Sequence, residues 1–355
     1  MSASAGGAID YRTAGVTDQD DALASVSRHL GPTLRIPEAR TLTGFGHFAS
    51  VLELTPDLAL ALCTDGVGTK TIVAARLGRY DTVGFDCVAM NVNDLVCVGA
   101  RPLALVDYIG VHTLDAARSD AILAGLGRAA RAAGIAIPGG ETAQLPELVG
   151  APDDDAAFDL VGTAVGTLHP RDVITGDAIV PGDVIVGLAS SGIHSNGLTL
   201  ARRALLDEGA YRLDDEVAAL GRTLGDELLE PTRIYVEAAT ALWDAGIATH
   251  GLAHITGGGL TNLLRLRPTV GFTIDALPDP PAIFGLIQAA GRIPDAEMFR
   301  VFNMGVGFVA VVAERDAAVV VDTVTARGFP CALIGRVTEP PAVVRVDPAA
   351  LELAD

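Results

Sequence analysis

The chain has 355 residues, half of them hydrophobic and only 5% aromatic, and its formal net charge at pH 7 is −19. This length allows two domains, or one large domain, with a substantial core. The excess of 44 Asp and Glu over 25 Lys and Arg argues against a broad nucleic-acid or anionic-membrane surface, although local donors and a metal can still bind phosphate.

Two features of the sequence predict a soluble, cytoplasmic protein. Residues 1–9 have neither the basic segment nor the apolar core of a signal peptide, and no apolar run approaches the length of a membrane span. The cysteines form no CxxC pair and lie in apolar runs, which predicts buried free thiols; they are Cys63, Cys87, Cys97 and Cys331.

The chain begins with a polar segment over residues 1–20, which predicts an extended arm, and a short helix is expected over Asp20–Leu30. An alternating run, Ala49–Leu54, predicts a strand. His47 precedes that strand in a glycine-containing loop, where contact with a ligand and simple solvation are both open.

The first motif follows an apolar run, Leu58–Leu62, that predicts a buried strand, and it continues into a helical segment, Thr71–Leu77. Glycines and the free amides of a helix start allow close approach to an anion, and an aspartate can hold a divalent cation that bridges phosphate oxygens. The only lysine of the chain stands here and offers a compact charge for phosphate. The candidate residues are Thr64, Asp65, Gly66, Gly68, Thr69 and Lys70.

The next segment, residues 81–99, predicts a mostly buried helix ended by Gly99. Asp86 and Asn93 are seven residues apart and share a face, with Asp94 beside them. Because a buried acid is costly unless it is paired or bound to metal, we interpret Asp94 as a metal ligand and Asn93 as a binding residue. A capping or backbone-bonding role for Asp94 is the alternative.

A second glycine segment follows a strand over residues 102–111, an amphipathic helix over 114–133 and a short strand over 135–137. The segment predicts another turn that carries an acid, and Asp65, Asp94 and Glu141 are expected to converge on one metal site. Its candidates are Gly139, Gly140, Glu141 and Thr142. An acidic loop is expected over residues 151–157 and a strand over Phe158–Thr167.

A change of composition over residues 169–182 predicts the boundary between domains 1–170 and 171–355. In the second domain, helices are expected over 198–208, 231–245 and 317–327, and strands over 183–189, 308–312 and 331–337. Polar, glycine-containing turns flank several of them and predict a ligand, or two ligands, carrying phosphate. The candidates are His194, Ser195, Asn196, Gly197, Thr256, Gly257 and Gly258.

Together these motifs resemble the phosphoribosylformylglycinamidine cyclo-ligase family, the aminoimidazole ribonucleotide synthetases, within a wider ATP-binding superfamily. The resemblance runs in order from Tyr11 to Val337. Its segments are Thr64–Lys70, Met90–Asp94, Gly139–Thr142, Ser190–Gly197, Leu229–Thr232, Ala253–Gly259 and Asn303–Gly307.

The resemblance implies an α/β (α+β) fold with two domains, in which the N-terminal mixed sheet forms a barrel across a homodimer and the C-terminal α/β domain completes the cleft. It implies ATP with Mg²⁺ held by Asp65, Asp94 and Glu141. In the implied reaction, ATP phosphorylates the formyl amide oxygen of formylglycinamidine ribonucleotide, and the amidine nitrogen closes the imidazole ring. Lys70 would help bind the phosphates, and His194 would either move a proton or donate a hydrogen bond to a phosphate.

Some positions depart from the family pattern, among them His47 and the segment Gln144–Leu148. They leave two alternatives open: a kinase or activating enzyme of the same superfamily that acts on a related substrate, and a nucleotide-binding regulator. Selenophosphate synthesis and hydrogenase maturation are disfavoured, because the chain lacks a reactive N-terminal cysteine and a C-terminal cysteine.

Overall fold

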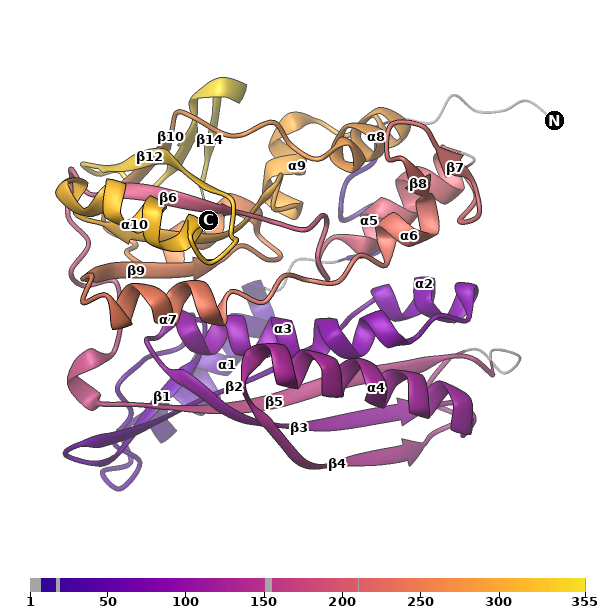
Figure 1. Ribbon diagram of the computed structural model, residues 1–355, viewed down its shortest axis with the longest axis horizontal. Coiled ribbons are helices and arrows are strands. Elements are labelled where there is room, and N and C mark those ends of the chain that lie inside the picture. Colours follow the sequence, from indigo (N-terminus) through magenta and orange to yellow (C-terminus); the bar gives the residue numbers. More distant parts are fainter. Residues whose placement is uncertain (1–7, 17–19, 151–154, 210, 355) are drawn as a thin grey trace.

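The computed structural model describes residues 8–16, 20–150, 155–209 and 211–354. Half of the predicted arm and residues 151–154 of the predicted acidic loop lie outside the described residues; in the described part of the arm, Tyr11–Gly15 form a turn. Two mixed sheets, each with helices packed beside it, make up the chain, as the predicted two-domain α/β fold requires (Figure 1). Among the described helices, none has the length and hydrophobicity needed to cross a membrane.

The first sheet has five strands in the order β1-β2-β5-β3-β4. All neighbours are antiparallel except β3 and β4, which are parallel. The strands are β1 (Ser50–Thr55), β2 (Leu58–Gly66), β3 (Arg101–Val111), β4 (Ala136–Gln144) and β5 (Phe158–Leu168). The predicted turn over Pro138–Thr142 is therefore wrong, because these residues pair with β3 as strand.

Among the residues that the structure describes, helices cover one face of this sheet and leave the other open. They are α3 (Asp81–Cys97) and α4 (Ala116–Ala133), which pack closely against each other. The contact requires two glycines: a Cβ on Gly84 would lie 2.6 Å from the backbone nitrogen of Leu126, and Gly125 faces the carbonyl of Asp81. On the other face, Val106 and Tyr108 of β3 remain exposed.

The second sheet has seven strands in the order β14-β13-β10-β12-β6-β11-β9. Its strands are β6 (Val184–Ala189), β9 (Thr249–His254), β10 (Gly271–Ile274), β11 (Val306–Val312), β12 (Cys331–Thr338), β13 (Val344–Val346) and β14 (Leu351–Leu353). The strands of the first sheet all precede residue 170 and those of the second all follow it. On this division we propose the two domains expected from the sequence.

The remaining elements are mostly helical. The N-terminal part contains α1 (Asp20–Leu30), η1 (Gly31–Arg35) and α2 (Lys70–Leu77), and the linker contains η2 (Pro170–Asp172). The C-terminal part contains α5 (Leu198–Arg202), η3 (Arg203–Glu208), α6 (Leu224–Leu228), α7 (Val236–Asp244), η4 (Gly259–Arg265), α8 (Ala282–Gly291), α9 (Asp295–Val301), η5 (Glu314–Asp316), α10 (Ala317–Thr325) and η6 (Asp347–Ala349), with a small hairpin of β7 (Glu216–Val217) and β8 (Arg222–Thr223).

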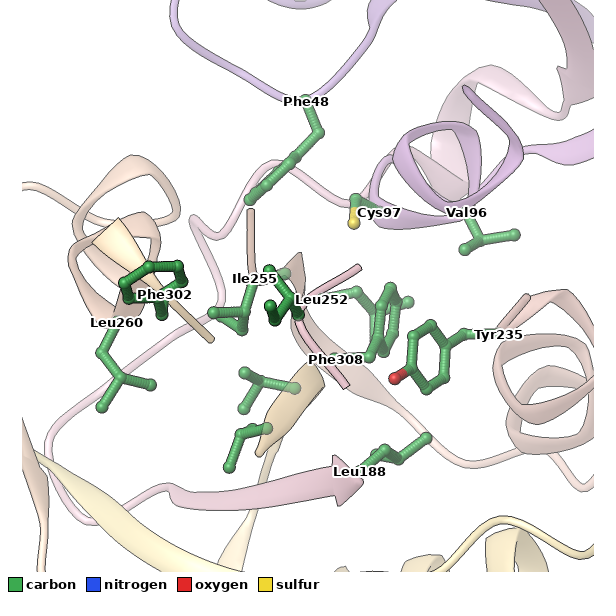
Figure 2. Close-up of a cluster of buried hydrophobic side chains, with 14 of the residues drawn as sticks. Phe48, Val96, Cys97, Leu188, Tyr235, Leu252, Ile255, Leu260, Phe302 and Phe308 are labelled. Carbon is green, nitrogen blue, oxygen red and sulfur yellow. The ribbon is translucent and has the colours of Figure 1, made fainter. Parts of the chain in front are cut away.

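Helix α3 lies between the two halves of the molecule (Figure 1). It packs on β2 and β5 from the first half and on β9 and α7 from the second. Figure 2 shows the apolar part of this junction, where Val96 and Cys97 of α3 lie near Tyr235 and Phe308. The rings of Tyr235 and Phe308 stack with centroids 5.1 Å apart. Both halves therefore share one hydrophobic core.

Candidate active site

The first motif has the predicted arrangement of strand, turn and helix, since β2 ends at Gly66 and α2 begins at Lys70. Gly68 has φ +67°, a left-handed conformation that favours glycine. The Asp65 carboxylate accepts the backbone N–H of Gly66 at 2.7 Å. The Thr69 hydroxyl lies 2.9 Å from that of Thr199 in α5, so the turn is joined to the C-terminal half.

Asp65 and Asp94 form a pair of neighbouring carboxylates on facing elements, β2 and α3. Burial and, second to it, the negative charge of Asp94 raise the pKa of Asp65 to about 6, although the Gly66 N–H acts in the opposite direction. The side chain of Asp94 is 16% exposed. Two acids held together in this way are stabilised by a cation placed between them.

His254, at the end of β9, fixes the orientation of Asp94. Its ring is fully buried, and Nδ1 lies 3.0 Å from Oδ1 of Asp94. Nε2 lies 3.4 Å from the side-chain amide nitrogen of Asn93, which can only donate. These partners assign the proton to Nδ1, so the histidine donates to Asp94 and accepts from Asn93.

Glu141 does not join this pair, and the predicted convergence of three carboxylates is wrong. Across the sheet, Asp65 of β2 is in one row with Gly162 of β5 and Asp107 of β3. Glu141 of β4 is in the adjacent row, with Tyr108 and Val161. Adjacent rows of a sheet point to opposite faces. Asp65 therefore faces α3, and Glu141 lies on the open face, with two strands between β2 and β4. Within the described residues, no group of three His, Cys, Asp or Glu side chains could hold a metal ion.

Lys70 also differs from the expectation. Its side chain is fully buried, and Nζ lies 2.8 Å from Oδ2 of Asp86, which is buried as well. Nζ donates to the carbonyls of Glu230, at 2.5 Å, and His194, at 3.4 Å. The ammonium is thus enclosed by protein groups, which corrects the prediction that it binds phosphate.

The segment Ser190–Gly197 reaches the first motif through its backbone. The imidazole of His194 is only 2% exposed, and burial lowers its pKa well below the ordinary value, so the ring is neutral. Its Nε2 accepts the N–H of Ser191 at 3.2 Å. The carbonyl of Ser195 lies 4.0 Å from the position of a Cβ on Gly68. His194 as a mover of protons stays a prediction.

The other predicted binding residues fall into two groups. Near the domain junction, the Asn196 amide lies against Gly257, and Thr256 donates its N–H to Asn262 at 2.8 Å. On the first sheet, Thr64 points to the open face and bonds the carbonyl of Gly162 at 2.9 Å. The β4 residues Gly139, Gly140 and Thr142 are exposed and lie away from the junction.

Sequence reasoning missed three charged or polar side chains, one on the first sheet and two at the domain junction. Asp107 lies on β3 in the same row as Asp65, directly beside Gly140, where a Cβ would fall 2.6 Å from its carboxyl carbon. Burial raises its pKa. An acid inside an apolar strand was a detectable signal. His254 and Arg265 had no such signal, because their roles depend on contacts across the domain junction.

A cavity of about 630 Å³ opens beside the first motif. Its wall includes the glycine turn and α2 on one side and the segment before β5 on the other. Apolar side chains and one arginine line it together with the polar turn: Gly68, Thr69, Ile72, Arg76, Leu148 and Phe158. A larger cavity of about 990 Å³ lies at the domain linker and contains none of the predicted site residues.

The raised pKa of Asp65 gives a stability prediction. The folded state penalises the ionised carboxylate, so the penalty is fully present above about pH 6 and disappears below the unfolded pKa of 3.8. We expect Asp65→Asn to raise the free energy of unfolding at pH 8 by about 1–3 kcal/mol. Urea unfolding should show this gain shrinking as the pH falls from 8 to 5.

Asp57→Asn is the matched control, because its carboxylate lies near the other end of β2 and is 89% exposed. It should show no pH-dependent gain. An Asp65→Asn protein that is no more stable than the wild type at pH 8 would contradict the assigned environment of Asp65.

Comparison with known proteins gives matches over most of the chain. Residues 46–168 match the model described as AIR synthase related protein, N-terminal domain, and residues 180–347 match the corresponding C-terminal domain. The phosphoribosylformylglycinamidine cyclo-ligase of Methanothermobacter thermautotrophicus is 46% identical over 333 residues, which cover 93% of this chain and 95% of that protein. The cyclo-ligase of Thermococcus kodakarensis is 49% identical over 313 residues, covering 87% and 89%.

Among solved structures, PurL of T. maritima complexed with ADP aligns with a TM-score of 0.56 at 18% identity. The alignment covers 87% of this chain and 45% of that one. A likeness at this identity supports the fold alone.

Proposed function

The chain belongs to the AIR synthase related family, and from this premise we propose that it is an ATP-dependent phosphoribosylformylglycinamidine cyclo-ligase of purine biosynthesis. Relatives at 44–49% identity over most of the chain carry that name. The observation that carries the proposal is the Asp65–Asp94 pair at the domain junction, beside a glycine turn with an adjoining cavity.

The cavity beside Gly68 suits a nucleotide. Its volume of about 630 Å³ lies in the usual range for a small-molecule site, and it combines an apolar wall with a few polar groups. Ile72 and Leu148 offer apolar surface for a base, whereas Gly68 and Thr69, which follow Asp65 closely in the chain, supply polar groups. Arg76 lines this cavity and can offer a positive charge to phosphate, a role that the buried Lys70 cannot fill.

The donor set also fits Mg²⁺. This ion keeps several waters and binds through one or two carboxylates together with substrate phosphates, so a site with three protein acids is not required. We propose Asp65 and Asp94 as its ligands. The raised pKa of Asp65 supports this assignment, since a bound cation removes the repulsion between the two carboxylates. Bound Mg²⁺ would neutralise charge on the transferring phosphoryl group.

The chain's own contribution is positioning. His254 keeps Asp94 in one orientation, and Asn262 fixes the Thr256–Gly258 turn through the N–H of Thr256. Holding ATP next to the formyl amide oxygen of the ribonucleotide makes an otherwise bimolecular phosphorylation effectively intramolecular. Once phosphate becomes the leaving group, the amidine nitrogen attacks the activated carbon and closes the ring.

The direct test is turnover by the purified chain. With ATP, Mg²⁺ and formylglycinamidine ribonucleotide, we expect equal amounts of ADP and aminoimidazole ribonucleotide. ATP bound without product would refute the cyclo-ligase and favour a superfamily kinase or activating enzyme with another substrate. The same assay with the other substrates of the superfamily would then identify it.

We also propose a homodimer in which the open faces of the two five-stranded sheets close into a barrel. Val106, 45% exposed, lies in the row Thr64–Thr163–Val106 of this face, and Tyr108 lies two rows further along, on the same face. An apolar sheet face left uncovered by helices needs a partner, and a second copy supplies an identical one. Glu141 lies on the same face and would meet the partner.

Val106→Lys is expected to convert the dimer to monomer at micromolar concentration, because a lysine buried without a partner in an apolar interface costs several kcal/mol. Sedimentation velocity measures the change. Leu123→Lys is the control, since Leu123 is 52% exposed on α4, outside the sheet face. A wild type that sediments as a monomer, or equal sedimentation of the two variants, would refute this interface.

A further inference from the structure

The ion pair of Lys70 and Asp86 is the most deeply buried charge pair described in the structure, with both side chains fully enclosed. Lys70 opens α2 directly after the glycine turn, and Asp86 lies in the middle of α3. Both belong to the N-terminal half, yet their other polar contacts cross to the C-terminal half. This arrangement is unusual for a pair that only stabilises its own domain.

The crossing contacts reach two segments. The Lys70 ammonium donates to the carbonyls of His194 and Glu230. Oδ1 of Asp86 accepts both the backbone N–H of Thr232, at 2.7 Å, and its hydroxyl, at 2.6 Å. Thr232 in turn lies 3.4 Å from the Ser195 hydroxyl. The pair thus bonds the start of the 230–233 segment and the Ser190–Gly197 loop at once.

The cost of this pair indicates a role beyond folding. Removing two charges from water is expensive, and a buried ion pair often stabilises a protein less than apolar residues of the same size would. In this protein, the hydrogen bonds that the pair makes offset the cost of removing its charges from water. A charged ammonium has three donors, and one lysine satisfies a carboxylate and two carbonyls from separate parts of the chain.

We propose that Lys70 and Asp86 are positioning residues that fix the Ser190–Gly197 loop against the Gly66–Thr69 turn. Both side chains are shielded from solvent, and neither residue is part of the cavity lining. Because the backbone of Lys70 follows Gly68 and Thr69 directly, any shift of its ammonium is transmitted to the turn that borders the nucleotide cavity. The inference rests on the proposed function, for which this turn and loop line the site.

The test compares Lys70→Met, Asp86→Asn and the double variant in the full chain. Each single change leaves one buried charge uncompensated, so we expect kcat/KM to fall by about 30-fold or more. The double variant removes both charges, and the amide oxygen introduced by Asp86→Asn can still accept from Thr232. The kcat/KM of the double variant should therefore be at least about tenfold higher than that of the less active single variant. The Mg²⁺ concentration for half-maximal rate should stay unchanged.

The only tryptophan of the chain provides a readout that does not depend on activity. Trp243 of α7 lies under the Arg101 guanidinium of β3, 5.6 Å from the ring centre, so its environment reports how the halves meet. We expect its emission to shift in both single variants and to return toward the wild type in the double variant. If the wild type turned over no substrate, the emission would still test the pair, while the proposed function would fail.

Arg79→Met with Asp226→Asn is the matched control, because this exposed ion pair joins the same two halves at the surface. It should change kcat/KM by no more than about twofold, since exposed pairs contribute little. A double variant as inactive as Lys70→Met would overturn the proposal and assign the ammonium directly to a ligand. Single variants as active as the wild type, with unchanged emission, would also overturn it.

Discussion

Asp94→Asn is expected to lower kcat/KM by about 100- to 1000-fold while leaving the fold intact. Asparagine keeps the shape of the side chain and can still accept a hydrogen bond from Nδ1 of His254. It removes the negative charge that faces Asp65, and with it half of the proposed Mg²⁺ site. ADP release measured across a range of Mg²⁺ concentrations should show a weaker dependence on the ion as well as a lower rate.

Asp81→Asn is the appropriate control for this experiment. Asp81 is the first residue of the same helix, α3, and forms an exposed ion pair with Arg128 at 2.8 Å. Its loss should change turnover by no more than about twofold. An Asp94→Asn enzyme within tenfold of the wild type would exclude Asp94 as a metal ligand.

Gly307→Ala should destabilise the junction between the two halves strongly. A Cβ there would lie 2.5 Å from Cε1 of His194 and would overlap the hydroxyl of Tyr235. Neither ring can move freely, because both are buried and the Tyr235 hydroxyl donates to the carbonyl of Ala189 at 2.9 Å. We expect a loss of about 2–3 kcal/mol in the free energy of unfolding, together with reduced turnover.

Gly285→Ala is the control for this variant and is expected to raise the free energy of unfolding. Gly285 lies in α8, and a Cβ at this position would meet nothing within 4 Å. Alanine there should stabilise the protein by about 0.5–1 kcal/mol and leave turnover unchanged. Urea unfolding measures both variants. Equal stability of the two proteins would show that the packing around Gly307 is looser than its contacts indicate.

Local signals were sufficient for the elements that carry the first half of the site. The apolar run before Asp65, the glycine turn and the helix after it were predicted correctly, and so was the buried helix that contains Asp94. Each depends on the order of residues within a single segment, which periodicity and glycine placement describe well.

The errors came from contacts between distant segments. Pro138–Thr142 has the local composition of a turn, but pairing with β3 makes it a strand, and the register then sets the face on which Glu141 lies. Pro231 looked like the first residue of a helix, yet α7 begins only at Val236. Asp86 and Asn93 hold this segment by accepting the backbone N–H groups of Thr232 and Tyr235. The burial of Lys70 has the same origin, since its partner is on another helix.

The placement of α3 between the two halves has a consequence for how the protein unfolds. One side of this helix belongs to the core under the first sheet, and polar groups on its other side complete the hydrogen bonding of residues 230–235. If α3 unfolded, the first half would lose part of its hydrophobic core and the second half would lose hydrogen bonds to buried backbone groups. The molecule should therefore melt in one cooperative transition, with no stage at which a native N-terminal half persists beside a disordered C-terminal half.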